Sequence, residues 1–295
     1  MILALTGATG FVGGHLLDQA LAAGHQVRAL TRRPQPPREG VTWIAGDLAT
    51  PGPLLEGTDA LVHVAGVVNA PDRAGFAAGN IEGTRAVLAA AQRAGVPRFI
   101  HVSSLAAREP GLSHYGWSKS EAERLVAASP LGWSVVRPPA VFGPGDTEML
   151  DLFRSARRGV VPAPAGRFSV IAVQDLAALL LALATAPADR ALYEVDDGGP
   201  GYTHAEFGRA LGTAVGRRVV PLPVPGALLD LAARADKLWR GPKAKLTPDR
   251  AAYIRHPDWT SDPARRPPAN VWRPERPTPE ALADTARWYR EQGLL

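Results

Sequence analysis

The segment Thr6–Gly13 limits the fold of this chain more than any other. It follows a short apolar run at residues 2–5 and precedes a helical pattern at residues 15–23. In such a strand–loop–helix unit, Gly7 permits a tight turn, Gly10 lets the backbone approach a pyrophosphate, and Gly13 lets the helix pack on the strand. The helix N-terminus offers free N–H groups to the anion. A glycine-rich turn without a ligand is the alternative, but the flanking strand and helix favour dinucleotide binding.

Short apolar runs alternate with helical stretches through the first half of the chain. The expected strands are Ile2–Leu5, Gln26–Leu30, Thr42–Ile44, Ala60–Val64, Phe99–Val102 and Trp133–Arg137. These runs are continuously apolar, which is typical of strands covered by helices on both faces. The sequence therefore predicts an α/β fold with a Rossmann-type, doubly wound parallel sheet.

The second half is richer in proline and glycine and predicts a second domain. We expect residues 1–143 to form the NAD(P)-binding domain. Residues 168–197 should return to it as the strands Phe168–Val173 and Leu192–Val195 around a helix at Asp175–Ala184. Residues 144–167 and 198–295 should form a smaller, mostly helical substrate-binding cap.

Composition excludes several classes of function. The chain of 295 residues is 46% hydrophobic, as folded globular proteins are, and it lacks cysteine, which excludes disulfide scaffolds, thiolate metal sites and cysteine nucleophiles. Its seven histidines follow no metal-ligand spacing, so no metal site is expected. The net charge of +5 is scattered, which favours an anionic small molecule over nucleic acid. The basic segment Arg234–Arg250 is most simply a solvated face.

Two features bear on localisation. The longest apolar run, Ala177–Ala184, is too short to span a bilayer. The first five residues carry no preceding positive charge and lead directly into the glycine loop, unlike a signal peptide. We therefore expect a cytoplasmic protein without a membrane partner.

The residues after the second expected strand indicate which dinucleotide binds. An NAD site usually has an acidic residue here for the ribose 2′-hydroxyl, whereas this chain has Arg32 and Arg33. Guanidinium groups suit the 2′-phosphate of NADP through charge-assisted hydrogen bonds. Two solvated arginines at a strand end are the alternative. The sequence favours NADP(H), with NAD still possible.

Tyr115 and Lys119 form the candidate catalytic pair. They are one helical turn apart and so share a helix face. A phenol has a pKa near 10, and a nearby ammonium would lower that pKa towards neutrality. Ser103 and Ser104 end the fifth strand, at the sheet edge where ligands bind. We expect Ser104, or else Ser103, to orient a carbonyl, while Tyr115 transfers the proton; an ordinary exposed helix face is the alternative.

Seven motifs in order resemble the extended or atypical branch of the short-chain dehydrogenase/reductases. This branch includes nucleotide-sugar epimerases, dihydroflavonol reductases and 3β-hydroxysteroid dehydrogenases. Besides the glycine loop, the motifs are Gly46–Leu48, His63–Gly66, Asn80–Thr84, Val102–Ser104, Tyr115–Lys119 and Arg137–Pro144. The resemblance covers nearly the whole chain. It departs from the epimerases at Leu105, where a third consecutive hydroxyl often stands in that group.

The resemblance also implies positions for the cofactor. Asp47 and Leu48 would border the adenine, Ala65 and Gly66 the pyrophosphate and ribose, and residues 138–141 the nicotinamide. Lys119 would hold the nicotinamide ribose. The residues expected at the cofactor are Gly7, Thr9, Gly10, Phe11, Val12, Gly13, Arg32, Arg33, Asp47, Leu48, Ala65, Gly66, Asn80, Ser103, Tyr115, Lys119, Pro138, Pro139, Ala140 and Val141.

Three functions compete on these grounds. The first is an NADP(H)-dependent oxidoreductase that transfers a hydride between the nicotinamide and a carbonyl or secondary alcohol of a small, partly apolar substrate. The second is a nucleotide-sugar epimerase or dehydratase with a recycled cofactor; its diphosphate clamp would be drawn from Arg154, Arg157, Arg209 and Arg217. The third is a non-catalytic NADP-binding regulator, which the presence of both Tyr115 and Lys119 disfavours. Either a monomer or a homodimer fits the family.

Overall fold

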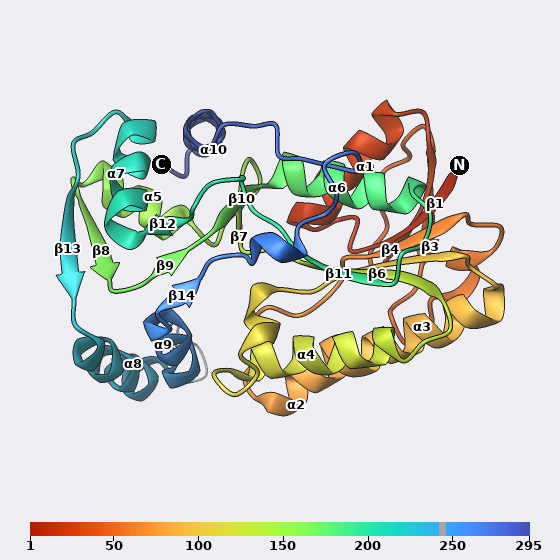
Figure 1. Cartoon of the computed structure of the whole chain (residues 1–295), viewed down its shortest axis with the longest axis horizontal. Coiled ribbons are helices and arrows are strands. Elements are labelled where there is room, and N and C mark those ends of the chain that lie inside the picture. Colours follow the sequence, from red (N-terminus) through yellow and green to blue (C-terminus); the bar gives the residue numbers. More distant parts are fainter. Residues whose placement is uncertain (242–245) are drawn as a thin grey trace. The chain divides into compact units, whose positions relative to one another are not determined.

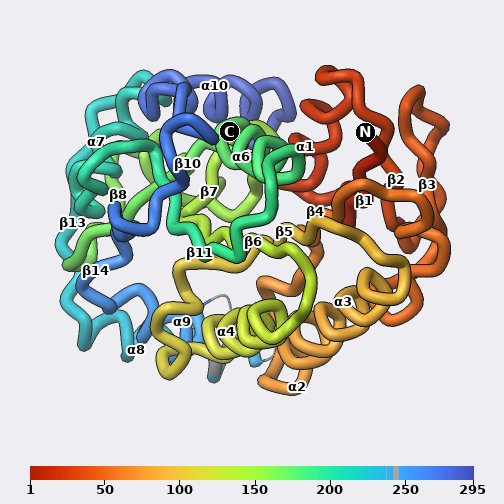
Figure 2. The backbone as a smooth tube through the Cα atoms, turned by 45° about the vertical axis from the view of Figure 1, so that its right-hand side comes forward, coloured from red at the N-terminus to blue at the C-terminus, as the bar shows by residue number. Residues whose placement is uncertain are grey.

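The computed structural model describes residues 1–241 and 246–295 and divides into two compact units. Unit 1 comprises residues 1–138, 174–195 and 263–273, and unit 2 comprises residues 139–173, 196–262 and 274–295. Figure 1 labels the elements of both units, and Figure 2 follows the backbone from a second direction.

Unit 1 is built on a parallel sheet. Within the described residues seven strands join it in the order β11-β6-β5-β4-β1-β2-β3. Their bounds are β1 Ile2–Thr6, β2 Gln26–Thr31, β3 Val41–Ala45, β4 Ala60–His63, β5 Arg98–Val102, β6 Gly132–Arg137 and β11 Ala191–Glu194. Every pairing in this sheet is parallel. The predicted Rossmann-type fold class is confirmed.

Helices cover both faces of this sheet. In Figure 1, α1 (Phe11–Ala22) and α6 (Val173–Thr185) lie on one face, and α3 (Gly83–Ala94) and α4 (His114–Ala127) lie on the other. Along the chain, four shorter helices come between α1 and α4: η1 (Gly52–Leu55), α2 (Arg73–Phe76), the π-helix η2 (Ala77–Glu82) and η3 (Leu105–Arg108). The short helix η5 (Pro263–Arg265) follows much later in the sequence. The start of α4 is capped by Ser113, whose hydroxyl accepts a hydrogen bond from the Gly116 N–H at 3.0 Å.

The continuously apolar strands put their side chains against these helices. One buried cluster includes Leu61 and Phe99 of the sheet, Val87 and Leu88 of α3, and Val126 of α4. This burial explains why the strands read as uninterrupted apolar runs in the sequence. The rigid layer that results fixes the carboxyl ends of the strands, where the candidate site lies.

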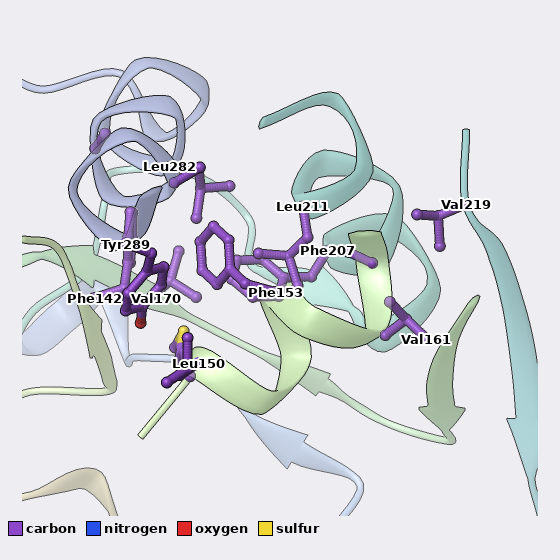
Figure 3. Packing of buried hydrophobic residues seen from close by; sticks show 14 of the residues in the cluster. Phe142, Leu150, Phe153, Val161, Val170, Phe207, Leu211, Val219, Leu282 and Tyr289 are labelled. Atoms are coloured by element: carbon purple, nitrogen blue, oxygen red, sulfur yellow. The ribbon is translucent and has the colours of Figure 1, made fainter. Parts of the chain in front are cut away.

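Unit 2 combines helices with short strands. Its helices are α5 Leu150–Arg157, α7 His204–Val215, α8 Gly226–Arg240, α9 Pro248–Arg255 and α10 Thr278–Glu291. Its strands are β7 Ala140–Phe142, β8 Val160–Pro164, β9 Arg167–Phe168, β10 Val170–Ala172, β12 Tyr202–Thr203, β13 Val220–Val224 and β14 Asp258–Trp259. Figure 3 shows Phe153 of α5 packed beside Tyr289 of α10, with Phe207 and Leu211 of α7 nearby. This apolar cluster is the core of unit 2.

The structure corrects the expected return of residues 168–173 to the parallel sheet. The expected strand Phe168–Val173 is divided: β9 pairs with β12 and β14, and β10 pairs with β7, all within unit 2. The physical reason is that each strand is too short to show a periodic pattern, so the sequence does not reveal its partner. Residues 263–273 belong to unit 1, a return that the sequence did not predict.

Helix α1 also begins earlier than expected, at Phe11 rather than near His15. The glycines of its first turns lower its apparent helix propensity in the sequence. Among the helices that the structure describes, none has both the length and the apolar character needed to cross a membrane.

Candidate active site

The predicted site residues of unit 1 gather at the carboxyl edge of its sheet. The glycine loop follows β1, Arg32 follows β2, Asp47 lies just beyond β3, Ala65 and Gly66 lie just beyond β4, Ser103 follows β5 and Pro138 follows β6. The strand order reverses direction between β1 and β4. In open α/β sheets, ligands bind at such a reversal, outside the carboxyl ends of the strands.

The glycine loop has the geometry of a phosphate cradle. Gly7 has a φ of +78°, and a Cβ there would lie 2.8 Å from the Ala65 nitrogen. A Cβ on Gly13 would lie 2.0 Å from the Gly7 carbonyl oxygen, so helix α1 approaches the loop only because this residue is glycine. Gly10 caps α1, whose first turn carries no acidic residue. The exposed helix N-terminus therefore suits an anion.

A series of buried hydrogen bonds supports the glycine loop. The Thr6 hydroxyl lies 2.7 Å from His63 Nδ1 and accepts a hydrogen bond from the Ala65 N–H at 3.2 Å. His63 Nε2 lies 3.1 Å from the Thr84 hydroxyl. Burial, followed by the charge of Lys119, lowers the pKa of His63 to about 3, so this imidazole is neutral at physiological pH. These hydrogen bonds hold the backbone of Ala65 close to Gly7.

The ring of His101 stacks on that of His63, with a centroid distance of 5.4 Å. His101 is buried, and neither of its ring nitrogens has a hydrogen-bond partner among the described residues. Burial, followed by the charges of Lys119 and His63, lowers its pKa well below the ordinary value. Two neutral imidazoles therefore lie in the sheet beneath the site.

Arg32 and Arg33 are exposed at the end of β2, as a binding site for a 2′-phosphate requires. Asp47 Oδ1 accepts hydrogen bonds from the Ala49 and Thr50 N–H groups at 3.0 and 2.9 Å and from the Thr50 hydroxyl at 3.0 Å. These bonds, chiefly the one from the Thr50 backbone, lower the Asp47 pKa, with a smaller contribution from Arg32. The Asp47 carboxylate thus stabilises the turn at residues 47–50.

Asn80 lies in the π-helix η2 and links the segment after β4 to helix α4. Its Oδ1 accepts from the Val67 N–H at 2.6 Å, and its Nδ2 donates to the Val67 carbonyl and to the Ser118 hydroxyl, both at 2.9 Å. A Cβ on Gly66 would lie 3.0 Å from Asn80 Oδ1 and 3.7 Å from Lys119 Nζ. Residue 66 must therefore be glycine, because a side chain there would collide with Asn80. Leu48 packs similarly against Gly83, where a Cβ would lie 2.8 Å from Leu48 Cδ1.

The two serines at the end of β5 have different partners. The Ser103 hydroxyl is buried and donates to Glu123 Oε1 at 2.5 Å. Glu123 is held in turn by Arg137, which donates to its two oxygens at 2.8 and 2.6 Å and to Glu194 at 3.2 Å. Ser103 is therefore part of a buried ionic network.

Ser104 is instead directed to Tyr115. Its oxygen caps η3 by accepting from the Ala106 N–H at 3.2 Å, and the hydroxyl lies close enough to the Tyr115 phenol to affect the pKa of that phenol. Burial raises the pKa of Tyr115, and the hydrogen bond from Ser104 opposes that rise. The phenol therefore remains protonated at neutral pH. Ser113, whose oxygen caps α4, is engaged elsewhere.

Lys119 is buried one turn after Tyr115 on α4. Its Nζ donates to the Val102 carbonyl at 2.6 Å. Burial lowers the Lys119 pKa to about 8, although Glu123 opposes this shift. Lys119 is not among the groups that shift the Tyr115 pKa, so in the protein alone the expected lowering of that pKa is absent. The reason is that desolvation of the phenol, which the sequence does not reveal, is the largest effect.

The remaining predicted cofactor residues lie at the loop and in unit 2. Thr9 is exposed, Val12 is half-buried, and the ring of Phe11 packs edge-on against His15 with a centroid distance of 5.9 Å. The Pro138 carbonyl accepts from the Leu105 N–H at 3.0 Å. Pro139, Ala140 and Val141 belong to unit 2, where Ala140 and Val141 form β7.

The sequence did not reveal the ionic network around Ser103. Glu123 follows Lys119 by one further turn, so residues 115, 119 and 123 share a face of α4. This spacing was the available signal. Glu194 and Arg108, which form an ion pair at 3.4 Å, carried none. No grouping of His, Asp and Glu side chains suited to a metal occurs in the part of the chain that the structure describes.

The diphosphate-clamp candidates of the epimerase alternative lie in unit 2. Arg209 and Arg217 line an open surface groove of about 480 Å³ together with Arg218. Arg154 donates to the Leu294 carbonyl at 3.1 Å and pairs with Asp151 at 3.4 Å. Arg157 is exposed at the end of α5. The structure brings only two of the four candidates to one groove.

Comparisons with known proteins agree with this geometry. A family model described as NAD(P)H-binding matches residues 7–187. Ceramide reductase from Caulobacter vibrioides is 39% identical over 311 residues, covering 100% of this chain and 96% of that protein. Two solved structures share the fold at 22% identity and a TM-score of 0.75: human epimerase family protein SDR39U1 with NADPH, covering 97% of this chain and 99% of that one, and MoeE5 with UDP-glucose and NAD, covering 99% of both.

The predicted cofactor class and enzyme class are therefore confirmed, and the resemblance noted in the sequence holds over the whole chain. The protein is an NAD(P)-dependent oxidoreductase that belongs to the NAD(P)H-binding family, in the extended branch of the short-chain dehydrogenases/reductases.

Proposed function

We propose that this protein is an NADPH-dependent carbonyl reductase that acts on a long-chain lipid ketone of the ceramide class. The observation that carries the reaction type is that Tyr115 and Lys119 share one face of α4, one turn apart, with Ser104 beside the phenol. A reductase needs a proton donor at this position, and burial, which raises the pKa of Tyr115, favours the protonated phenol. The full-length similarity to ceramide reductase supports the substrate class. The proposed lipid ketone is larger than the small, partly apolar substrate expected from the sequence.

The residues at the sheet edge fit the cofactor. The loop around Gly7 and the N-terminus of α1 would bind the pyrophosphate, and Arg32 with Arg33 would bind the 2′-phosphate. Lys119, held at the Val102 carbonyl, would bind the nicotinamide ribose. When bound, NADPH supplies a hydride to the carbonyl carbon of the substrate.

The chain's own groups handle the proton. Ser104 donates a hydrogen bond towards the carbonyl oxygen, and Tyr115 gives its proton to that oxygen as the carbon is reduced, so the product is a secondary alcohol. The phenolate left behind regains a proton from solvent. Ser103 takes no part, because its hydroxyl is committed to Glu123.

Turnover of NADPH with an N-acylated long-chain ketone tests this proposal. We expect the wild type to oxidise NADPH, and Tyr115→Phe to lose about a thousandfold in kcat while still binding NADPH. Tyr193→Phe is the matched control, because Tyr193 is a phenol of unit 1 bonded to Asp189 at the far edge of the sheet. Unchanged turnover in Tyr115→Phe would contradict the assignment of the proton donor.

The epimerase alternative is tested separately, by calorimetric titration of the NADP-loaded protein with UDP and dTDP. The proposal predicts no detectable heat. Micromolar binding would favour a nucleotide-sugar substrate and would contradict the lipid assignment.

A further inference from the structure

Helix α8 of unit 2 turns an apolar face to solvent. Its large exposed apolar residues are Leu228 (53% exposed), Leu231 (64%), Leu238 (90%) and Trp239 (88%). Leu228, Leu231 and Leu238 lie three and seven positions apart, and Trp239 adjoins them, so all four share one side of the helix. An ordinary surface helix turns such a side towards the core. On α8 the fully buried residue is the small Ala233.

The acidic groups of α8 are engaged in ion pairs. Asp230 pairs with Arg255 of α9 at 2.9 Å. Asp236 pairs with Arg240 at 3.2 Å and accepts from the Leu246 N–H at 2.8 Å. Neither carboxylate of the helix is left unpaired. Figure 1 shows α8 beside α9, the helix that supplies one of these pairs.

The exposed charge next to the apolar face is positive. Arg234, four positions before Leu238, is exposed, and residues 226–250 contain six lysines and arginines against three aspartates. The sequence predicts a solvated basic face for residues 234–250, of which residues 242–245 lie outside the described residues. Solvation of charge accounts for the arginines. It does not account for a leucine and a tryptophan that are almost wholly exposed side by side.

We infer that α8 docks on the surface of an anionic lipid bilayer. The helix lies in the plane of the interface, with Leu231, Leu238 and Trp239 at the level of the acyl chains and the arginines at the lipid phosphates. Charge complementarity selects this occupant over a second copy of the chain. A symmetric contact between two such faces would bring two segments of net positive charge together.

This inference revises the expectation of no membrane partner, which rested on the absence of a spanning segment. An interfacial helix needs no span, because it buries one face only. Binding to lipid vesicles is measured without substrate. The inference therefore does not depend on the proposed reductase activity.

Flotation of the full chain with vesicles tests the inference. We expect binding to vesicles of phosphatidylcholine mixed with phosphatidylglycerol, weaker binding to phosphatidylcholine alone, and loss of binding as salt is raised. The triple variant Leu231→Ser, Leu238→Ser, Trp239→Ser should bind the anionic vesicles at least about tenfold more weakly. Arg234→Gln should weaken binding about fivefold on anionic vesicles only.

The control is the double variant Val68→Ser, Leu222→Ser, which removes exposed apolar side chains elsewhere and should float as the wild type does. Circular dichroism and NADPH binding check that each variant is folded. If the triple variant fails to fold, Arg234→Gln and Leu238→Ser alone still decide the outcome. Failure of the wild type to float with anionic vesicles would overturn the inference. So would a dimer that the triple variant converts to monomer in the absence of vesicle binding.

Discussion

The two units distribute polar and apolar side chains in opposite ways. Unit 1 buries ionisable groups at the carboxyl edge of its sheet: Lys119, Glu123, Glu194, His63 and His101 are each less than a tenth exposed. Unit 2 has an apolar core of its own but leaves Leu238 and Trp239 of α8 almost wholly exposed. Both arrangements cost stability, because buried charge loses hydration and exposed apolar surface orders water.

This difference indicates where each unit has functional contacts. Costly groups are retained where they contact something other than the chain itself. In unit 1 those groups surround the position expected for a nucleotide and a carbonyl. In unit 2 they cover one side of a helix. Five predictions test this contrast, from the largest expected effect to the smallest.

Glu123→Ala should be the most damaging to stability. It leaves Arg137 without its bidentate partner and Ser103 without its acceptor, both in a buried environment. Loss of one member of a buried ion pair costs about 3–5 kcal/mol. Urea denaturation measures this cost. The control is Glu121→Ala on the same helix, whose pair with Arg124 is exposed and should contribute under about 0.5 kcal/mol. Equal losses in the two variants would contradict the buried network.

The two serines should differ sharply in turnover. Ser104→Ala removes the hydrogen bond to Tyr115 and should lower kcat about a hundredfold with little change in stability. Ser103→Ala should lower the free energy of unfolding and leave kcat of the folded enzyme within about threefold. Steady-state kinetics and urea denaturation of both variants give the comparison. A reversed pattern would assign the acting hydroxyl to Ser103.

The double variant Arg32→Ala, Arg33→Ala should weaken NADPH binding about tenfold to a hundredfold and leave NADH binding nearly unchanged. The reason is that only NADPH carries the 2′-phosphate. Fluorescence titration with both cofactors measures the ratio. Arg38→Ala, which removes an arginine paired with Asp18 on the surface, is the charge-matched control. An equal loss for both cofactors would contradict the assignment of the arginines to the phosphate.

The buried imidazoles should make the stability of unit 1 depend on pH. The pKa of His63 is about 3 in the folded protein and near 6.5 in the unfolded chain, so the unfolded state takes up the proton first as pH falls. The contribution is fully present above about pH 6.5, and about 2 kcal/mol of it is lost by pH 5. Urea denaturation at both pH values should show this slope, and His63→Gln should flatten it. The partly exposed His25→Gln should retain it; identical slopes in all three proteins would refute the account.

The apolar face of α8 should matter least to folding. Leu238→Ala should change the free energy of unfolding by less than about 0.5 kcal/mol, because the side chain is already in water. Leu282→Ala, in the buried core of the same unit, should cost about 2–5 kcal/mol. Thermal or urea denaturation compares the two leucines. A large cost at Leu238 would mean that its face is covered within the folded chain.

The sequence predicted unit 1 well for a physical reason. Its strands are continuous apolar runs separated by helices, and the constraints on Gly7 and Gly13 act over a few neighbouring residues. Unit 2 gave no comparable signal. Strands such as β8 and β13 contain prolines and pair across long stretches of chain, so their partners are set by tertiary packing.

The candidate site divides in the same way. The spacing of Tyr115 and Lys119 was visible, because a helix turns on a fixed period. The contact between Ser103 and Glu123 joins residues on two different elements, and the pKa of Tyr115 depends on burial; neither follows from spacing. The exposed leucines of α8 were invisible for a further reason: an apolar pattern in sequence predicts a buried face and does not identify what buries it.

The central claim, net reduction of a carbonyl with Tyr115 as proton donor, is tested most directly by isotope transfer. The wild type is incubated with NADPH carrying deuterium at the nicotinamide C4 and with the lipid ketone, and the product is analysed by mass spectrometry. The account predicts one deuterium bound to the new carbinol carbon, one NADPH consumed per alcohol formed, and about a thousandfold slower product formation with Tyr115→Phe. A product formed without net consumption of NADPH would contradict it and would assign the site to chemistry with a recycled cofactor.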